Sequence, residues 1–589
     1  MIKLNVCIAI LMVSLFALDQ VIANYEPLPV HRGDEPIEFT NPIPYLGGRQ
    51  CPGDSIGTTW YDKQENCGHG QRIKVDILNQ AHINWIRMPD SLQNERFCGW
   101  NARYTDGSYY GQTQVSPSWS GYVQLDITRD TLPVNQRTVN AYHYDPGSGY
   151  YSYIDIDAGN LYGAWPHTPR TPQVPDHIWP YVCCANNGNI ILATGDYNAN
   201  SHHVYCTTDE GITWTLIATF DSCAVLSQFL QASILSGSND VVFVHTQYIT
   251  DTVASGQLDN DIWYMRSSDG GVTWGPYTNV TNYQPYPIDS VRAYCDVCAA
   301  YDDNDNLHIA WSGRQVTDNY YEASKIYYWN EIIDTITVVS SPSIYYNEPG
   351  GWWISQSYVS GWRMPADRPQ LVVDRASDWI YCLWQGNDDY TDCSDDGFFN
   401  QEIFGSYSTD NGLTWSNYRN LTNTRSPGGV AGECLSEDYM TAHPYVVNDS
   451  IYITYEEDID AGTWTDSEGI MTHNPVRCWV FPTSLITGID EHHNMEPSAI
   501  SLRVAPNPFV KQTSISLSRG QSAESMELKI YDASGRVVKS FPHLTPDALR
   551  ATLQWNGTDQ HGESLPAGVY FITLTSKDKS ATKKIVKLK

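Results

Sequence analysis

Apolar and polar residues alternate with a period of two in short runs between residues 70 and 487. Two examples are Leu307-His-Ile-Ala-Trp311 and Ile451-Tyr-Ile-Thr-Tyr455. Alternation of this kind, interrupted by Gly, Pro, Asn and Asp, predicts β-strands joined by tight turns. The runs group into seven units, over residues 72–104, 138–166, 179–220, 227–279, 291–340, 369–421 and 443–485.

Three of these units share a segment that aligns without gaps. The copies are Thr207-Thr-Asp-Glu-Gly-Ile-Thr-Trp214, Ser267-Ser-Asp-Gly-Gly-Val-Thr-Trp274 and Ser408-Thr-Asp-Asn-Gly-Leu-Thr-Trp415. The aspartate can accept hydrogen bonds from the amides that follow it, the glycine can take a positive φ, and the tryptophan begins the returning strand. The segment therefore predicts a hairpin turn. We assign a structural role to the shared residues Asp209, Gly211, Trp214, Asp269, Gly271, Trp274, Asp410, Gly412 and Trp415.

The shared segment resembles the Asp-box (BNR) repeat of sialidase-like β-propellers. In that family the box lies between the third and fourth strands of a blade, away from the ligand face. The resemblance and the seven units together predict an all-β chain with a seven-bladed β-propeller over residues 57–487. Six blades are the alternative, because sialidases have six. The last unit lacks a fourth strand, which Gly57–Asp62 could supply, and this pairing would close the ring and remove an exposed sheet edge.

The sign of the charge changes near residue 500. The whole chain has 35 Lys and Arg against 67 Asp and Glu, a net charge of −32. Residues 503–589 alone hold 13 basic and 7 acidic residues, a net charge of +6. Such a change predicts a domain boundary, with a linker over residues 488–500 and a separate small β domain over 501–589.

The C-terminal domain carries several specific motifs. They are Val504-Ala-Pro-Asn-Pro-Phe509, Ile530-Tyr-Asp-Ala-Ser-Gly-Arg-Val-Val538, Trp555-Asn-Gly557, Leu565-Pro-Ala-Gly-Val-Tyr-Phe571 and Lys583-Lys-Ile-Val-Lys587. In this order they resemble the C-terminal sorting domain of type IX secretion substrates, an immunoglobulin-like β-sandwich. The resemblance implies an outer-membrane secretion machinery as partner, and its motif residues are Pro506, Asn507, Pro508, Gly535 and Gly568. An ordinary tethering sandwich is the alternative.

The N-terminus has the features of a secretory signal peptide. Lys3 precedes the apolar stretch Val6–Leu18, and a small-residue pattern ends at Ala23. We therefore predict a signal peptide over residues 1–23 and an N-terminal extension over 24–56. No later apolar run is long enough for a transmembrane helix, so we expect a secreted or surface-attached mature chain. The acidic excess argues against nucleic acid as a partner.

A sialidase-type active site needs three arginines that clamp the substrate carboxylate, a tyrosine nucleophile beside a glutamate, and an aspartate as acid and base. The family marks its first arginine with Phe/Tyr-Arg-Ile-Pro, and Ile86-Arg-Met-Pro89 and Trp362-Arg-Met-Pro365 match this string only in part. The candidate residues for such a site are Arg87, Arg292, Arg368, Glu437 and Tyr439.

Because this catalytic set is incomplete, the sequence favours binding of an extracellular glycan or protein without turnover. An exo-acting glycoside hydrolase of the sialidase type is one alternative. A structural component of the cell surface or of an adhesion system is the other.

Two acidic loops gather oxygen ligands that suit calcium. The candidates are Asp302, Asp303 and Asp305 in the first loop and Asp388, Asp392 and Asp395 in the second. Neither loop has the spacing of an EF-hand, and a polar turn is the alternative interpretation of the first. No other cofactor is predicted.

The histidines and cysteines show no known metal motif. His202 and His203 lack the His-Glu-x-x-His arrangement of metalloproteases and are interpreted as loop residues. Cys295 and Cys298 form the only Cys-x-x-Cys, without the second pair that a zinc site normally requires. The cysteines are therefore expected to be buried small side chains or to form one scattered disulfide.

Overall fold

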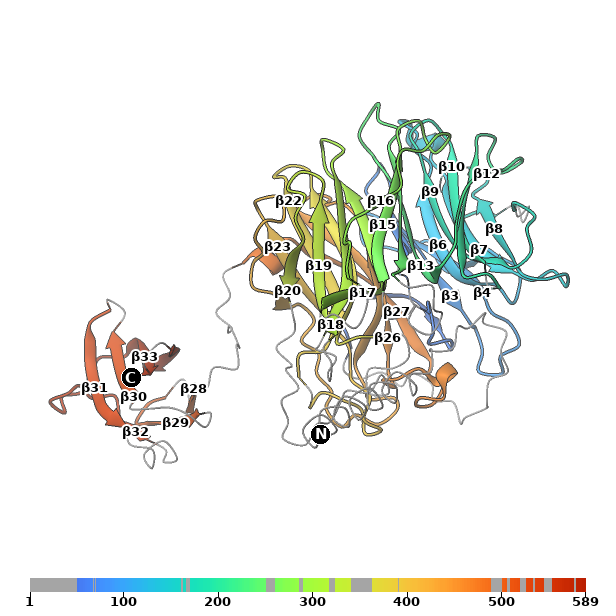
Figure 1. Ribbon diagram of the computed structural model, residues 1–589. Coiled ribbons are helices and arrows are strands. Elements are labelled where there is room, and N and C mark those ends of the chain that lie inside the picture. The colour runs from blue at the N-terminus through green and yellow to red at the C-terminus, as the bar shows by residue number, and fades with distance from the viewer. Residues whose placement is uncertain are drawn as a thin grey trace, which may run out of the picture. The chain divides into compact units, whose positions relative to one another are not determined.

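The computed structural model describes residues 50–588 apart from the internal gaps 67, 69, 160, 162, 166–169, 197, 250–259, 285–289, 317–323, 341–362, 390, 489–499, 506–508, 520–525, 533–534, 545–552 and 577–578. The predicted signal peptide, most of the N-terminal extension and the motif residues Pro506, Asn507 and Pro508 lie outside the described residues. The chain divides into two compact units, residues 1–489 and 490–589. The regular secondary structure described in both units is almost entirely β-strand (Figure 1).

The first unit contains a series of antiparallel sheets whose strands follow one another in chain order. The first three sheets comprise β2 (Ile73–Val75), β3 (Ala81–Arg87), β4 (Phe97–Arg103) and β5 (Thr113–Gln114); then β6 (Gly121–Ile127), β7 (Thr138–Tyr144) and β8 (Tyr151–Ile156); then β9 (His177–Cys184), β10 (Ile190–Asp196), β11 (Ser201–Thr207) and β12 (Thr215–Phe220).

The next strands form an eight-stranded sheet made of two groups of four. The groups are β13 (Cys223–Ala232), β14 (Val241–Tyr248), β15 (Asn260–Ser267) and β16 (Thr278–Asn279), and β17 (Ser290–Tyr301), β18 (Leu307–Val316), β19 (Lys325–Asn330) and β20 (Thr337–Ser340). A single pair, Asn260 with Ala293, joins them. Each group therefore has the same internal order as the four-stranded sheets.

Two further sheets complete the first unit. One comprises β21 (Ala366–Asp374), β22 (Trp379–Gly386), β23 (Glu402–Ser408) and β24 (Arg419–Asn420), and the other β25 (Ser436–Ala442), β26 (Ser450–Asp458), β27 (Asn474–Pro482) and β1 (Asp54–Thr59). Strand β1 thus crosses from the beginning of the unit to pair with β27 at its end. The helical segments among the described residues are short: η1 (Pro133–Asn135), η2 (Trp464–Asp466) and α3 (Ser484–Thr487).

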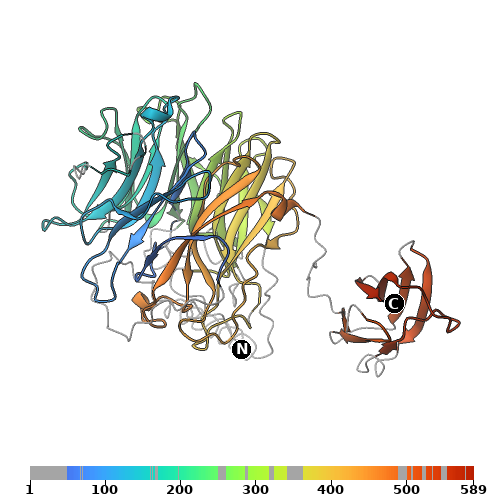
Figure 2. The same ribbon diagram turned by 180° about the vertical axis from the view of Figure 1, so that it is seen from behind.

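The first strands of successive sheets lie beside one another. Strand β6 contacts β9, β9 contacts β13, β13 contacts β17, β17 contacts β21, and β21 contacts β25. Strand β2 contacts both β6 and β25, so the contacts return to their starting point. Figure 2 shows the blue N-terminal strands beside the orange strands β26 and β27. The sheets are arranged radially, with their first strands innermost.

Apolar side chains fill the spaces between neighbouring sheets. One cluster packs the second sheet against the third through Val139, Ile154 and Leu192. Another packs the first sheet against the last through Ile83, Trp85 and Val476. Because apolar burial is the main favourable term in folding, these inter-sheet layers hold the unit together. No helix in the described part of the chain is long and apolar enough to span a membrane.

The structure differs from the prediction for the second unit. Its first strand is β6, which begins at Gly121, whereas the predicted unit begins at Thr138. Its sheet has three described strands. The residues Val123, Leu125 and Ile127 carry the expected alternation, but Gln124 and Asp126 between them are also buried, so both faces of the strand are covered.

The C-terminal unit consists of two sheets. They are formed by β28 (Ile500–Ala505), β29 (Thr513–Arg519) and β32 (Leu553–Trp555), and by β31 (Val537–Leu544), β30 (Met526–Asp532), β33 (Gly568–Ser576) and β34 (Lys579–Lys587). Their core contains Phe509, Ile530 and Trp555. Gly535 takes a positive φ of 84° in the turn between β30 and β31, and Gly568 begins β33. In the basic tail, Lys587 is buried and its Nζ donates to the carbonyl oxygen of Gly557 at 3.1 Å.

Candidate functional site

The first strands carry β-bulges close to the end at which they begin. The pairing register shifts between Gly121 and Gln124 on β6, between Asp367 and Gln370 on β21, and between Asp438 and Thr441 on β25. A bulge changes the direction of the side chains beside it. These bulges therefore re-aim side chains at one end of the radial array of sheets.

Four bulky residues near these beginnings have a left-handed backbone. Their φ angles are 53° at Tyr122, 51° at Trp179, 51° at Arg368 and 56° at Tyr439. A positive φ is uncommon for residues other than glycine and is held only where the surrounding structure requires it. This conformation recurs on β6, β9, β21 and β25, close to where each of these first strands begins. We therefore look for the candidate site at this end of the strands.

Tyr439 lies among three arginines. The guanidinium carbon of Arg368 is 4.6 Å from the centre of the Tyr439 ring, and that of Arg363 is 5.1 Å from it. Arg72, which precedes β2, donates from Nη2 to the carbonyl oxygen of Tyr439. We call these four residues the Arg–Tyr cluster. They come from three places far apart in the sequence.

Carboxyl groups surround the cluster. Arg363 Nη1 lies 3.0 Å from Asp438 Oδ1, and Arg72 Nε lies 3.3 Å from Glu65 Oε1. Arg368 is paired more loosely, with Nη1 at 3.9 Å from Asp367 Oδ2. Burial raises the pKa of Asp367 to about 8, although the nearby Arg368 opposes this effect. The Asp367 carboxyl is therefore largely protonated at neutral pH.

Some hydrogen-bond donors of the cluster lack an acceptor. The Nε atoms of Arg363 and Arg368 are buried and make no hydrogen bond to any described residue. Arg368 Nη2 donates at 3.4 Å to the carbonyl oxygen of Asn66. A buried donor without an acceptor is destabilising, and a charged one more so. An anionic group placed beside these two Nε–H donors would accept hydrogen bonds from them.

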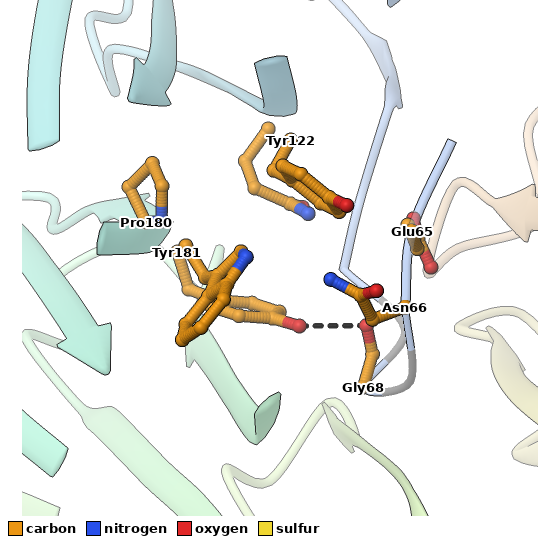
Figure 3. A pocket seen from close by; sticks show the side chains of 8 residues that line it. Glu65, Asn66, Gly68, Tyr122, Pro180 and Tyr181 are labelled. Atoms are coloured by element: carbon orange, nitrogen blue, oxygen red, sulfur yellow. Dashed lines mark hydrogen bonds between the residues drawn. The ribbon is translucent and has the colours of Figure 1, made fainter. Parts of the chain in front are cut away.

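The described part of segment 61–72 covers the cluster. Its side chains are buried, including Asp62, Lys63 and Gln64. Beside it lies a small cavity, lined by Glu65, Asn66, Gly68, Tyr122, Gln124, Trp179, Pro180 and Tyr181 (Figure 3). Tyr181 Oη donates to the Gly68 carbonyl oxygen at 2.6 Å. The cavity volume of about 10 Å³ is near the lower limit for one water molecule.

The structure brings together only two of the five residues predicted from the sialidase pattern, Arg368 and Tyr439. Arg87 ends β3 and lies over the ring of Phe97, at 5.7 Å from its centre. Arg292 is buried on β17, where its Nη1 donates to the Val291 carbonyl oxygen at 3.0 Å.

Glu437 lies two residues before Tyr439, but its side chain is buried and hydrogen-bonded to a different residue. Its Oε1 accepts from the hydroxyl of Thr424 at 2.5 Å. Burial raises the pKa of Glu437, and the nearby Glu402 raises it further. Burial likewise raises the pKa of Tyr439, while Arg363 and Arg368 oppose the effect. The protonated phenol is therefore the favoured state of Tyr439.

Sequence reasoning missed Arg72 and Arg363. Arg363 belongs to Trp362-Arg-Met-Pro365, the later of the two partial matches to the sialidase arginine string. Of Arg87 and Arg363, the arginines of the two strings, only Arg363 lies in the Arg–Tyr cluster. Arg72 carries no comparable signal, because only the fold brings β2 beside β25.

The three shared turns have one geometry. Each lies between the third and fourth strand of its group, between β11 and β12, β15 and β16, and β23 and β24. The box carboxylate accepts the amide N–H of the threonine four residues on, at 2.8, 2.8 and 2.9 Å, and its hydroxyl at 2.6 Å in all three. The hydroxyl of Thr213 lowers the pKa of Asp209 to about 2.

These turns lie far from the Arg–Tyr cluster. Successive strands in a group are antiparallel, so the third strand ends opposite the beginning of the first. The box glycines Gly211, Gly271 and Gly412 have φ of 84°, 84° and 81°. Trp274 Nε1 donates to the Gly271 carbonyl oxygen at 2.9 Å, and Trp415 Nε1 to the Thr337 hydroxyl at 3.2 Å. The box residues support turns and packing.

The predicted calcium residues bind protein groups. Asp302 Oδ1 accepts the amide N–H groups of Asn304 and Asn306, both at 2.8 Å, as in a polar turn. Asp303 pairs with Arg375, and Asp305 accepts from the hydroxyl of Ser233.

In the second acidic loop, Asp392 Oδ1 accepts from Asn400 Nδ2 and from the Ser426 amide, both at 2.9 Å. Burial raises the pKa of Asp388. The backbone amide of Asp395 donates to the Gly429 carbonyl oxygen at 2.9 Å. Calcium binding at either loop stays a prediction.

His202 and His203 are not loop residues. Both lie on β11, and both are buried. Among the described residues, two groups bring three potential metal ligands within 4.8 Å of one another. They are His202 with Cys223 and His245, and His177 with Asp196 and His203. Cys295 is disulfide-bonded, whereas Cys298 is free and buried, so the Cys-x-x-Cys forms no internal bridge.

Several solved structures are similar to the chain at low identity. A PL25 ulvan lyase has 9% identity over 70% of this chain and 100% of its own, with a TM-score of 0.41. PorZ, a surface component of the type-IX secretion system of Porphyromonas gingivalis, has 12% identity over 88% and 81%, with a TM-score of 0.19. The Hadza microbial sialidase Hz136 has 12% over 59% and 73%, with a TM-score of 0.24.

Identities and scores this low transfer no reaction and no ligand to the chain. No curated protein matches it in sequence. Residues 507–580 match the family of the FlgD Ig-like domain, in agreement with the two-sheet structure of the C-terminal unit.

Proposed function

We propose that the chain is an exported protein whose first unit is a seven-bladed β-propeller that binds an extracellular glycan. The seven blades are the seven groups that begin with β2, β6, β9, β13, β17, β21 and β25. The cyclic contacts of these strands support the ring, and the pairing of β1 with β27 supports its closure. The single pair between Asn260 and Ala293 then links two adjacent blades.

The ligand class follows from the Arg–Tyr cluster. The observation that carries the proposal is the pair of buried Nε–H donors of Arg363 and Arg368 that lack acceptors beside Tyr439. Guanidinium groups bind carboxylates and sulfates through paired hydrogen bonds, and aromatic rings supply apolar faces for sugars. We therefore propose a glycan that carries carboxylate or sulfate groups. Arg363 and Arg368 are buried, and Arg368 contacts Asn66, so binding requires the backbone near Asn66 to move.

Binding without turnover agrees with the state of Tyr439. A tyrosine nucleophile needs a carboxylate that takes its proton, and Glu437 binds Thr424 instead. A sialidase-type exo-hydrolase is the second candidate, favoured by the convergence of Arg72, Arg363 and Arg368 on one tyrosine. A structural surface component is the remaining alternative.

A glycan-binding assay tests the ligand class. Purified full-length chain is applied to an array of uronic-acid, sialylated, sulfated and neutral glycans, and positive ligands are titrated by calorimetry. We expect acidic glycans to bind, and Arg368→Gln to weaken the affinity at least about tenfold through the loss of a charged hydrogen bond. Arg375→Gln, at an exposed ion pair with Asp303, is the control and should bind normally. Preference for neutral glycans contradicts the proposal, and an empty array favours the structural alternative.

A turnover assay separates the hydrolase. Release of 4-methylumbelliferone is measured from a sialoside and from a panel of other glycosides. We expect no release above that of the chain heated to inactivity. Release that Tyr439→Phe abolishes and Arg375→Gln preserves would establish the hydrolase and refute binding without turnover.

We further propose that residues 501–589 direct passage across a bacterial outer membrane, after a signal peptide has taken the chain across the inner one. The order of the C-terminal motifs and the Ig-like match support this role. In a bacterium with type IX secretion, the full chain should reach the surface or the medium, and a chain ending at residue 488 should remain in the periplasm. Equal export of both chains would refute the sorting role.

A further inference from the structure

Two histidines and a cysteine meet between the third and fourth groups of strands. His202 lies on β11, Cys223 begins β13, and His245 lies on β14. All three side chains are fully buried. They are remote in sequence from one another and belong neither to the Arg–Tyr cluster nor to the shared turns. We call them the His–Cys group.

Two of the three separations between their ligand atoms are those of a tetrahedral metal site, and all three ligand atoms lie within 4.8 Å of one another. His202 Nδ1 lies 3.1 Å from His245 Nδ1, and Cys223 Sγ lies 3.4 Å from the same atom. Zinc binds nitrogen at about 2.0–2.1 Å and sulfur at about 2.3 Å. At a tetrahedral angle these bond lengths place two nitrogens about 3.3 Å apart and nitrogen and sulfur about 3.5 Å apart. Both separations in the structure agree within about 0.2 Å, the tolerance expected of a metal site.

A neighbouring tyrosine fixes the tautomer of His245. Tyr277 Oη donates its one proton to Gln247 Oε1 at 2.5 Å. His245 Nε2 lies 2.6 Å from the same Tyr277 oxygen, so the histidine must be the donor of that bond. The proton of neutral His245 is therefore on Nε2, and Nδ1 presents a lone pair to His202 and Cys223. Outer hydrogen bonds that orient a histidine in this way are typical of metal ligands.

The surroundings of the group are aromatic. The rings of Phe220 and Phe243 lie with their centres 4.9 and 5.0 Å from that of His245. An apolar shell excludes water and strengthens the bonds between a cation and its ligands. It also makes an uncharged thiol and imidazole stable when no ion is bound, so the fold can form the group before it takes up the metal.

The second group of three is different, because protein hydroxyls occupy its ring nitrogens. His177 Nδ1 lies 2.7 Å from Tyr205 Oη. The two nitrogens of His203 lie 2.9 Å from Ser201 Oγ and 3.1 Å from Thr219 Oγ1. These contacts already satisfy the imidazoles, so we assign no metal to that group. His203 and His202 are adjacent on β11 and therefore form a matched pair for experiments.

We propose that His202, Cys223 and His245 bind one zinc ion, through the Nδ1 atoms of the histidines and the sulfur of the cysteine. Thiolate and imidazole together favour Zn²⁺ over Ca²⁺ or Mg²⁺. The carbonyl oxygens of Phe220 and Asp221 lie near the sulfur, at 3.3 and 3.5 Å from it. On binding, the thiol loses its proton to solvent, and the ion ties β11 to β13 and β14.

Metal analysis of the untagged full-length chain tests the site. The chain is incubated with zinc, freed of unbound metal by dialysis, and analysed by inductively coupled plasma mass spectrometry. We expect about one zinc per chain in the wild type and in the controls His203→Gln and Cys206→Ser. Cys206 is a buried cysteine on the same strand. We expect loss of the zinc in His202→Gln and Cys223→Ser. A wild type without zinc, or a Cys223→Ser chain with the full amount, overturns the proposal.

Cobalt replacement keeps the test decisive if a variant folds poorly. Zinc is removed by chelation, cobalt is added, and the absorption spectrum reports a thiolate-to-cobalt charge-transfer band when sulfur is a ligand. We expect the band in the wild type and in Cys206→Ser. Cys223→Asp, which keeps three ligands, should bind cobalt without the band, and circular dichroism verifies that it is folded. A wild type that binds cobalt without the band contradicts ligation by Cys223.

Discussion

Arg368 holds its guanidinium carbon 4.6 Å from the centre of the Tyr439 ring, and both residues have a left-handed backbone. They lie near the beginnings of neighbouring first strands, β21 and β25. The bulges after Asp367 and Asp438 free these residues from regular pairing. The two bulged strands thus bring the guanidinium of Arg368 onto the ring of Tyr439 at the candidate site.

We predict that Arg368→Met is strongly destabilising. At pH 9, above the Asp367 pKa of about 8, the change leaves the buried carboxylate without its main cation, and removal of one partner from a buried pair typically costs about 3–5 kcal/mol. Asp367→Asn in the same chain should restore part of the loss, with a coupling of about 0.5–3 kcal/mol. Urea unfolding of the two single variants and the double variant measures this coupling.

The matched control is Arg375→Met. Arg375 and Asp303 are about one third exposed, so their pair should contribute no more than about 1 kcal/mol. Strict additivity of the Arg368 and Asp367 changes would show that the two groups do not interact.

A second prediction concerns pH. Burial raises the pKa of Glu402 from 4.5 to about 7, although a hydrogen bond from Asn420 opposes this. The folded state therefore holds the proton more tightly than the unfolded state. The contribution of this bound proton to the free energy of unfolding is fully present below pH 4.5. It is lost as the pH rises through about 7, and the loss is on the order of 3 kcal/mol.

Glu402→Gln cannot lose a proton, so its stability should fall less over this range. We expect wild type and variant to be equally stable near pH 4.5 and the variant to be more stable near pH 8. Urea midpoints at several pH values measure the difference. Glu433→Gln, at an exposed position, serves as the control. Parallel curves for wild type and Glu402→Gln would contradict the assignment.

Much of the all-β architecture could be predicted from the sequence because its signals are local. The period-two runs predict strands such as β18 and β26. The three shared turns mark the hairpin between the third and fourth strands in three of the groups. The pairing of Gly57–Asp62 with the last sheet was also predicted, from the missing fourth strand, and the strand found there is β1 (Asp54–Thr59). Strand β6 was missed although Val123, Leu125 and Ile127 alternate with Gln124 and Asp126 in the same period-two pattern.

The candidate site depended on information that local patterns do not hold. Arg72, Arg363 and Tyr439 are brought together only by the contacts of β25 with β2 and with β21. The His–Cys group likewise joins residues of three strands. His202 and His203 looked like loop residues because polar pairs are uncommon in buried strands, and here hydrogen bonds to neighbouring side chains make their burial possible.

The third prediction separates two roles of glycine. Gly412 has a φ of 81°, and a Cβ there would lie 2.0 Å from the ring of Tyr328. Gly188 has a φ of 90°, with nothing within 4 Å of the added carbon. Gly188→Ala should therefore cost only the backbone strain, about 1–2 kcal/mol. Gly412→Ala should cost clearly more, because the added carbon also displaces the ring. Equal losses in thermal unfolding would show that Tyr328 moves aside freely.

The last prediction tests whether β1 closes the first unit. Ile56 points into the apolar layer with Trp85 and Val476, whereas the adjacent Ser55 is exposed. Ile56→Asp should destabilise the chain by on the order of 3 kcal/mol or more, since it removes a buried apolar side chain and introduces a carboxylate. Ser55→Asp should change stability by no more than about 0.5 kcal/mol.

If β1 detaches in the Ile56→Asp chain, the edge of β27 becomes free to pair with other molecules. We therefore expect this variant to aggregate below its unfolding temperature, as measured by light scattering, while Ser55→Asp stays monodisperse. Since the two substitutions place the same charge on adjacent residues of one strand, a difference between them reports the burial of Ile56 in the apolar layer. Identical behaviour of the two variants would mean that the ring does not depend on β1 for closure.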